Sequence, residues 1–157
     1  MTRVWTTCAA CLGALAVMAT VTLSGPARAG GAEDIEYRKA VMKAVGGHFG
    51  AIKLIVTGKV ANKDDLKGHA QALADLAKAS QNVFPKGSDS FAGKTEALDK
   101  IWSNWDAFQK VNKAFITHAA DLNKAAASGD LKAATAAFGA MGKNVCKACH
   151  DDYRQKS

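Results

Sequence analysis

The five residues Cys146-Lys147-Ala148-Cys149-His150 constrain the fold of this 157-residue chain more than any other feature of its sequence. Two cysteines three positions apart, followed at once by a histidine, form the C-x-x-C-H pattern of covalent c-type haem attachment. On a helix, residues three and four positions apart lie on one face. Both thiols can therefore bond to one porphyrin while His150 reaches the iron from the same side. The motif predicts one covalently bound haem c, held by Cys146 and Cys149, with His150 as an iron ligand.

Three other uses of the cysteine pair fit the sequence less well. A thioredoxin-type dithiol occurs in a βαβ context, and the residues around Cys146 show no strand pattern. Structural zinc sites take four protein ligands, and no second cysteine pair remains once the leader described next is removed. A disulfide between Cys146 and Cys149 would leave the adjacent His150 without a role.

Residues 1–29 have the pattern of a secretory signal peptide. Arg3 supplies the positive charge, residues 4–23 carry no charge, and an A-x-A cleavage site ends at Ala29. We expect cleavage after Ala29, which leaves residues 30–157 as one domain. A retained membrane anchor is the alternative, but the charged chain that follows argues against it. We therefore expect a periplasmic protein with no stable membrane insertion after cleavage.

The leader also contains a second C-x-x-C, from Cys8 to Cys11, but Leu12 stands where the motif needs a histidine. We expect this pair to leave with the signal peptide. The whole chain has a formal net charge of +7, of which Arg3 and Arg28 in the leader supply two. This modest excess suits acidic protein partners, and the chain lacks the dense basic runs and motifs of nucleic-acid-binding proteins.

The mature chain has the pattern of an all-α protein. It is rich in Ala, Lys and Leu, has a single proline, and lacks strand alternation. Apolar residues recur at intervals of three and four, which is typical of helices with one buried face. We predict helices over residues 34–56, 63–83, 98 or 103 to 128, and 130–155. Short connections between the first and second and between the third and fourth helices favour an antiparallel bundle.

Local signals mark several helix features. Gly46 and Gly47 interrupt the apolar stripe of the first helix, and each costs about 1 kcal/mol relative to Ala in a helix interior. We therefore expect another helix or the haem to pack closely against them. Gly58 stands where a C-terminal glycine cap belongs, and Asp130 can cap the start of the last helix.

With these features in place, the chain resembles the class II c-type cytochromes, the cytochrome c′ family. The resemblance rests on the C-x-x-C-H motif of the last helix and on three shorter matches: Tyr37-Arg38-Lys39 with Met42, Ile101-Trp102, and Tyr153-Arg154. It covers nearly all of the mature chain. It implies an antiparallel up-down-up-down four-helix bundle, the known architecture of that family, with the haem attached to the C-terminal helix.

The resemblance also implies one of two functions. In one branch of the family the haem is high-spin and five-coordinate, an apolar side chain crowds its distal face, and it binds nitric oxide or carbon monoxide. In the other branch a first-helix methionine is the second axial ligand, and the low-spin haem carries electrons. Met42 occupies that distal position, so we expect iron ligation by His150 and Met42 and an electron carrier; the gas-binding protein is the alternative. By the same resemblance Arg38 is assigned to a haem propionate, since an arginine fork suits a carboxylate.

The remaining expectations concern activity and partners. No polar acid–base pair for catalysis can be identified, so we do not expect an enzyme. Redox proteins are the expected partners, acidic ones if Lys143 and Lys147 beside the attachment motif take part in docking. The resemblance leaves monomer and homodimer open. His48, His69 and His118 are expected at helix surfaces or in local hydrogen bonds.

Overall fold

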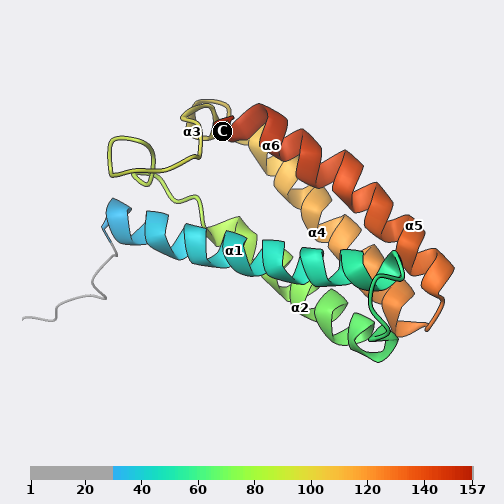
Figure 1. The fold of residues 1–157 in the computed structure, drawn as a ribbon. Helices are drawn as coiled ribbons and strands as arrows, with labels where there is room; N and C mark the ends of the chain where they lie inside the picture. The colour runs from blue at the N-terminus through green and yellow to red at the C-terminus, as the bar shows by residue number, and fades with distance from the viewer. Residues whose placement is uncertain (1–29, 157) are drawn as a thin grey trace, which may run out of the picture.

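The computed structural model describes residues 30–156, so the predicted signal peptide lies outside the described residues (Figure 1). Within them the chain forms helices and no strand. The α-helices are α1 (Gly31–Val56), α2 (Leu66–Ala79), α3 (Lys100–Ser103), α4 (Trp105–Ala127), α5 (Leu131–Met141) and α6 (Ala148–Tyr153). Two 3₁₀ turns, η1 (Lys63–Asp65) and η2 (Ser80–Asn82), flank α2, and the π-helical segment η3 (Gly142–Lys147) joins α5 to α6.

These elements form the predicted four-helix bundle. Its members are α1, α2, α4 and the continuous rod of α5, η3 and α6 (Figure 1). The helix α2 packs against both α1 and α4, and α4 packs against α5. The helix α1 also packs against α5 but has at most marginal contact with α6. The helix α1 is therefore held mainly by α2; its contact with α5 is smaller, and its contact with α6 is smaller still.

Local signals predicted some helix ends correctly. The side chain of Asp130 accepts a hydrogen bond of 2.9 Å from the backbone N–H of Ala133, as an N-cap does. Gly58 has a φ of +67°, which favours glycine. The N–H of Lys59 then donates to the carbonyl of Leu54 at 2.9 Å, which closes a Schellman-type end of α1.

Two predicted helices are interrupted. The third breaks at Asn104, whose φ of −129° and ψ of 55° are not helical, so that α3 and α4 are separate. The fourth remains a single rod but changes from α to π winding over Gly142–Lys147. The alternative start at residue 103 lies next to the first of these breaks, whereas the change to π winding leaves the apolar periodicity unbroken.

The apolar residues gather in two clusters. The main core contains buried side chains of α1, α2, α4, α5 and η3, among them Ile52, Leu73, Leu122 and Met141. A second group, here called the aromatic cluster, lies at the α6 end of the bundle. It consists of buried Ile101, Phe108 and Tyr153 with half-buried neighbours that include Phe84, Trp102 and Cys149.

The expected close packing of another helix against Gly46 and Gly47 is not found, and the alternative, packing of the haem against them, stays a prediction. Both glycines are exposed, and a Cβ atom built at either would meet nothing within 4 Å. They lie on the solvent side of α1. A close approach occurs instead at Gly142, where a Cβ would lie 3.3 Å from Cζ of Phe49. Across residues 30–156 we find no helix long and apolar enough to cross a membrane.

Candidate haem site

The two cysteines of the motif lie on the last helical rod, between the two apolar clusters. Cys146 is in η3 and packs against the main core, whereas Cys149 is in α6 and packs against the aromatic cluster. Both are half-buried, and both thiols are free. Two unpaired thiols on apolar surroundings, followed by an imidazole, are the donor set that covalent haem attachment requires.

The π-helical segment η3 ends within the motif, at Lys147. A π turn holds more residues than an α turn, and such turns are frequent at functional sites. The wider turn rotates the residues that follow it about the helix axis. It therefore sets the direction in which Cys149 and His150 point relative to α5. Gly142 opens the segment at the point where the ring of Phe49, stacked on Phe138 at 4.4 Å, comes close.

Burial holds the thiols in the protonated form. It raises the pKa of Cys146. At Cys149, burial, helped by the neighbouring Cys146 and Asp152, raises the pKa to about 11. Because the thiolate is the reactive form of cysteine, both groups in the folded, haem-free chain react more slowly at neutral pH than an ordinary cysteine.

His150 follows Cys149 directly and is exposed. Partial burial and the nearby Arg154 lower the pKa of its imidazole. The ring is therefore neutral at neutral pH, which is the form that ligates a metal.

The chain beyond His150 is tied to the segment before α3. The N–H of Leu98 donates to the carbonyl of Tyr153 at 3.0 Å. The N–H of Gln155 donates to the carbonyl of Glu96 at 2.7 Å. The guanidinium of Arg154 also pairs with the carboxylate of Glu96 at 2.7 Å. These contacts hold α6, and with it the attachment motif, against the aromatic cluster.

Arg38 is almost fully buried, with 4% of its surface exposed. Its Nη1 donates to the carbonyl of Val83 at 3.2 Å and to Oγ of Ser88 at 2.8 Å. Its Nη2 donates to the carbonyl of Ser88 at 2.8 Å and to Oγ1 of Thr95 at 3.0 Å. Arg38 thus anchors the long connection between η2 and α3. Its assignment to a haem propionate stays a prediction.

The same guanidinium lies over two rings of the aromatic cluster. Its Cζ is 5.2 Å from the ring centroid of Phe84 and 5.6 Å from that of Trp102. Burial lowers the pKa of Arg38, and Asp34 one turn earlier opposes this effect. Arginine stays charged in proteins, so the contact is a cation–π interaction. It attaches α1 to the cluster that also holds Cys149.

Met42 lies one turn after Arg38 on α1. Positions i and i+4 share a helix face, so Met42 is on the side of α1 that Arg38 turns toward the aromatic cluster. It is half-buried and belongs to neither of the two clusters formed by residues 30–156. Met42 is therefore a half-buried apolar side chain of α1 that is part of neither apolar cluster.

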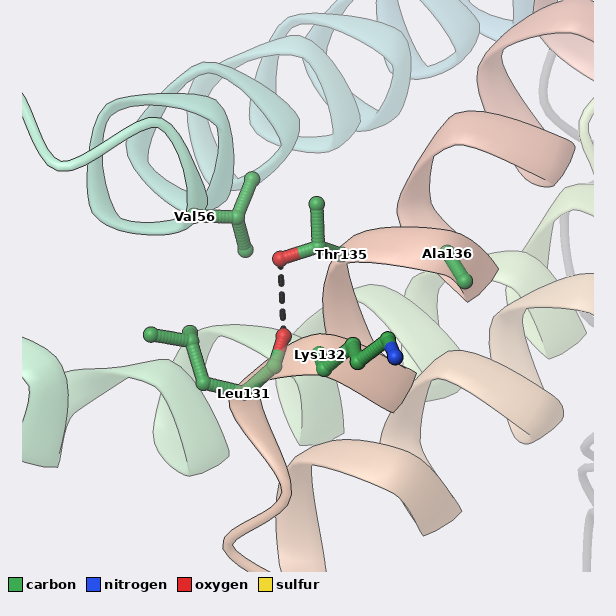
Figure 2. Close-up of a pocket in the computed structure, with 5 residues that line it drawn as sticks. All are labelled: Val56, Leu131, Lys132, Thr135 and Ala136. Atoms are coloured by element: carbon green, nitrogen blue, oxygen red, sulfur yellow. Dashed lines mark hydrogen bonds between the residues drawn. The ribbon is translucent and has the colours of Figure 1, made fainter.

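A shallow hollow elsewhere on the bundle carries no comparable chemistry. It is lined by Val56, Leu131, Lys132, Thr135 and Ala136, and its one marked hydrogen bond runs from Thr135 Oγ1 to the Leu131 carbonyl at 2.7 Å (Figure 2). Thr135 precedes Cys146 by eleven residues, about 16 Å along a helix axis. The hollow is at the other end of the rod and is separate from the motif.

Comparison with known proteins was made on sequence and on structure. A family model described as cytochrome c′ matches residues 33–154. The chain is 34% identical over 143 residues to a cytochrome c′ of Rhodospirillum rubrum, across 91% of this chain and 95% of the relative. It is 32% identical over 125 residues to a cytochrome c′ of Alcaligenes xylosoxydans, across 79% of this chain and 94% of that one. A solved variant of Alcaligenes xylosoxidans cytochrome c prime, ferrous with bound NO, matches with a TM-score of 0.75 and 30% identity over 83% of this chain and 99% of that chain.

These relatives correct the expected function. They are named cytochrome c′, and a solved neighbour holds nitric oxide. An iron that accepts such a ligand needs a coordination position that the protein leaves free. The predicted low-spin electron carrier, with His150 and Met42 as its two axial ligands, is therefore wrong. The resemblance predicts that Met42 lies near the iron, and this position stays a prediction; the sequence does not show whether the sulfur bonds to the metal or only fills space.

Proposed function

Since the chain belongs to the cytochrome c′ family and carries one covalently bound haem c, we propose that it is a high-spin, five-coordinate haem protein that binds nitric oxide or carbon monoxide. The observation that carries the proposal is the solved relative with bound NO, which shares this fold over 83% of the chain. The haem iron supplies the gas-binding and one-electron chemistry when it is bound. The protein supplies attachment, one iron ligand and the surroundings.

Three residues of the last helical rod would hold the haem. Cys146 and Cys149 would attach it through their sulfur atoms, and the neutral imidazole of His150 would be the protein's iron ligand. The π turn of η3 supports this assignment, because it directs the motif after the helix has packed against the main core. The contacts of Tyr153 and Arg154 then restrain the motif from its other side.

Met42 would cover the other side of the iron without bonding to it. A methionine side chain is flexible and apolar, and it fills irregular space well. Its half-buried position, outside both clusters, leaves it free to do so. An apolar cover disfavours water and charged ligands, whereas small neutral gases pay no comparable desolvation cost. The expected selectivity is for nitric oxide and carbon monoxide.

The surroundings of Met42 support binding without catalysis. Along its face of α1, the neighbouring residues are Arg38, Val45 and Phe49. The two apolar residues pack against the main core, and Arg38 is hydrogen-bonded to the long connection. This face therefore offers no free acid–base pair, which is what a peroxidase or reductase would need.

We further propose a periplasmic location, on the strength of the leader sequence over residues 1–29. Electron exchange with redox proteins is compatible with a single haem. An acidic docking partner has weaker support, because Lys147 pairs with Asp151 and Arg154 pairs with Glu96. Much of the basic charge beside the motif is thus balanced within the chain.

The proposal can be tested with nitric oxide and a matched variant. The reduced holoprotein should bind one nitric oxide per haem in a titration followed by absorption and electron paramagnetic resonance. Met42→Leu keeps the bulk of the side chain and removes its sulfur. We expect the spectra of this variant to match those of the wild type. A haem that takes up no nitric oxide, or a Met42→Leu variant that changes from low-spin to high-spin, would contradict the proposal.

A further inference from the structure

Two histidines outside the haem site meet between α1 and α2. His48 and His69 approach through the same ring atom, with Nδ1 of one 2.9 Å from Nδ1 of the other. Their ring centroids are 5.2 Å apart, and the rings are tilted by 57°. Both side chains are half-buried and remain accessible from solvent. Neither residue has a part in the proposed gas binding.

The separation of the two nitrogens is informative about metals. Imidazole nitrogens lie about 2.0–2.1 Å from a bound zinc. At bond lengths of that size, two nitrogens at right angles about one metal are about 2.9 Å apart, and in a tetrahedral site about 3.4 Å apart. The observed 2.9 Å is the length of a hydrogen bond between the two rings, and it is also close enough for both nitrogens to bind one metal ion with little change in their separation. Square-planar nitrogen coordination is typical of Cu(II) and Ni(II), and Cu(II) is bound most tightly among the divalent first-row metals.

We propose that His48 and His69 form a surface binding site for Cu(II). In the metal-free chain one ring must donate its Nδ1 proton to the other, because two acceptors or two donors could not approach so closely. When a metal ion binds, the donor ring changes tautomer and carries its proton on Nε2, so that both Nδ1 lone pairs are available to the metal. The χ2 torsion of histidine is soft, so both lone pairs can turn toward one ion with little backbone movement.

The site is open rather than enclosed. Within the part of the chain that the structure describes, no group of three His, Cys, Asp or Glu side chains is placed to hold a metal. Two protein ligands thus hold the ion, and water completes its coordination. Such a site exchanges its metal readily. It is also independent of the haem, because His48 and His69 are on α1 and α2 whereas the attachment residues are on η3 and α6.

The test is a Cu(II) titration of the oxidised holoprotein, followed by electron paramagnetic resonance and calorimetry. We expect one copper per chain at this site, with nitrogen ligands visible in the spectrum. His48→Ala and His69→Ala should each weaken binding tenfold or more, which corresponds to about 1.4 kcal/mol. The matched control is His118→Ala on α4, which should bind copper as the wild type does.

Variants that keep the fold make the test decisive. His48→Gln and His69→Gln retain a polar side chain of similar length without an imidazole, and an unchanged haem spectrum would confirm that each is folded. Copper binding at wild-type strength in either folded Gln variant would overturn the proposal, and so would equal losses in the His118→Ala control. Loss confined to the His48 and His69 variants would support it, whatever the gas affinity of the haem.

Discussion

Arg38 on α1 donates from both terminal nitrogens to Ser88, fifty residues further along the chain, with Nη1 to Oγ and Nη2 to the carbonyl each at 2.8 Å. Ser88 is completely buried. This pair joins the first helix of the bundle to the long connection between η2 and α3. It therefore holds that connection against α1, and it makes Arg38 important for stability before any haem contact is considered.

Arg38→Ala should destabilise the holoprotein by about 3 kcal/mol, because a charged donor of several buried hydrogen bonds is lost and its acceptors are left unpaired. Urea unfolding measures the change in the free energy of unfolding. Lys39→Ala is the neighbouring control. Lys39 is exposed and bonds only to Glu36 at 2.7 Å, so its removal should cost less than about 1 kcal/mol. Equal effects of the two substitutions would show that the loop contacts of Arg38 contribute little.

Gly47→Ala should stabilise the protein by about 1 kcal/mol, since an exposed glycine in a helix interior is replaced by the best helix former. A Cβ at this position meets nothing within 4 Å. The thermal midpoint of the holoprotein measures the effect. Gly58→Ala provides the opposite control, because its φ of +67° strains any other residue. A lower midpoint for Gly47→Ala would mean that something not present in the isolated chain packs against this face of α1.

In the haem-free chain, the raised pKa of Cys149 should affect both the rate at which this thiol is alkylated and the dependence of stability on pH. Because the pKa of Cys149 is raised to about 11, at pH 8 its thiolate fraction, and with it the rate of alkylation by iodoacetamide, should be about two hundredfold lower than for an ordinary cysteine with a pKa of about 8.5. The pKa is higher in the folded chain than in the unfolded one. The contribution of Cys149 to the free energy of unfolding is therefore fully present below about pH 8.5, and it is lost as the pH rises toward 11.

Alkylation followed by peptide mass analysis checks this prediction residue by residue. Denaturant should bring Cys146 and Cys149 to the same, faster rate. The holoprotein, in which both sulfur atoms are bonded to the haem, should show neither the reaction nor the pH effect. Equal and fast alkylation in the native haem-free chain would contradict the burial of Cys149 described above.

Met42→Ala should speed carbon monoxide binding, because it removes an apolar cover from the ligand's path. A tenfold faster association corresponds to a barrier lower by about 1.4 kcal/mol. Flash photolysis of the ferrous complex measures the rate. Lys43→Ala, at the next position and exposed, should leave it unchanged. An unchanged rate in Met42→Ala would place Met42 away from the ligand.

The attachment motif and the bundle could be predicted from sequence because their signals are local. The attachment motif is one short segment of a single helix and contains Cys146, Cys149 and His150. The spacing of apolar residues indicates which helix faces are buried. Asp130 and Gly58 act within a few residues of themselves, so their caps were also predictable. Gly47 carried no such information, because a glycine in a predicted helix can be exposed to solvent or packed against a close neighbour, and the sequence does not distinguish the two.

Features that depend on distant contacts could not be predicted. The π turn of η3 coincides with the approach of Phe49 to Gly142. The loop contacts of Arg38 join residues 45 to 57 positions apart. The pairing of His48 with His69 depends on how α1 lies against α2. Met42 has a known position on α1, but whether its sulfur bonds to iron depends on small differences in the distance between the two atoms. A local sequence pattern does not determine that distance.

The absorption spectrum of the ferrous wild-type protein, recorded with and without carbon monoxide, tests the central claim most directly. We predict a high-spin, five-coordinate spectrum that converts fully on addition of one carbon monoxide per haem, and a ferric form without a sulfur-to-iron charge-transfer band. A spectrum that is low-spin in both oxidation states, resists carbon monoxide, and shows a charge-transfer band that Met42→Leu abolishes would contradict the account.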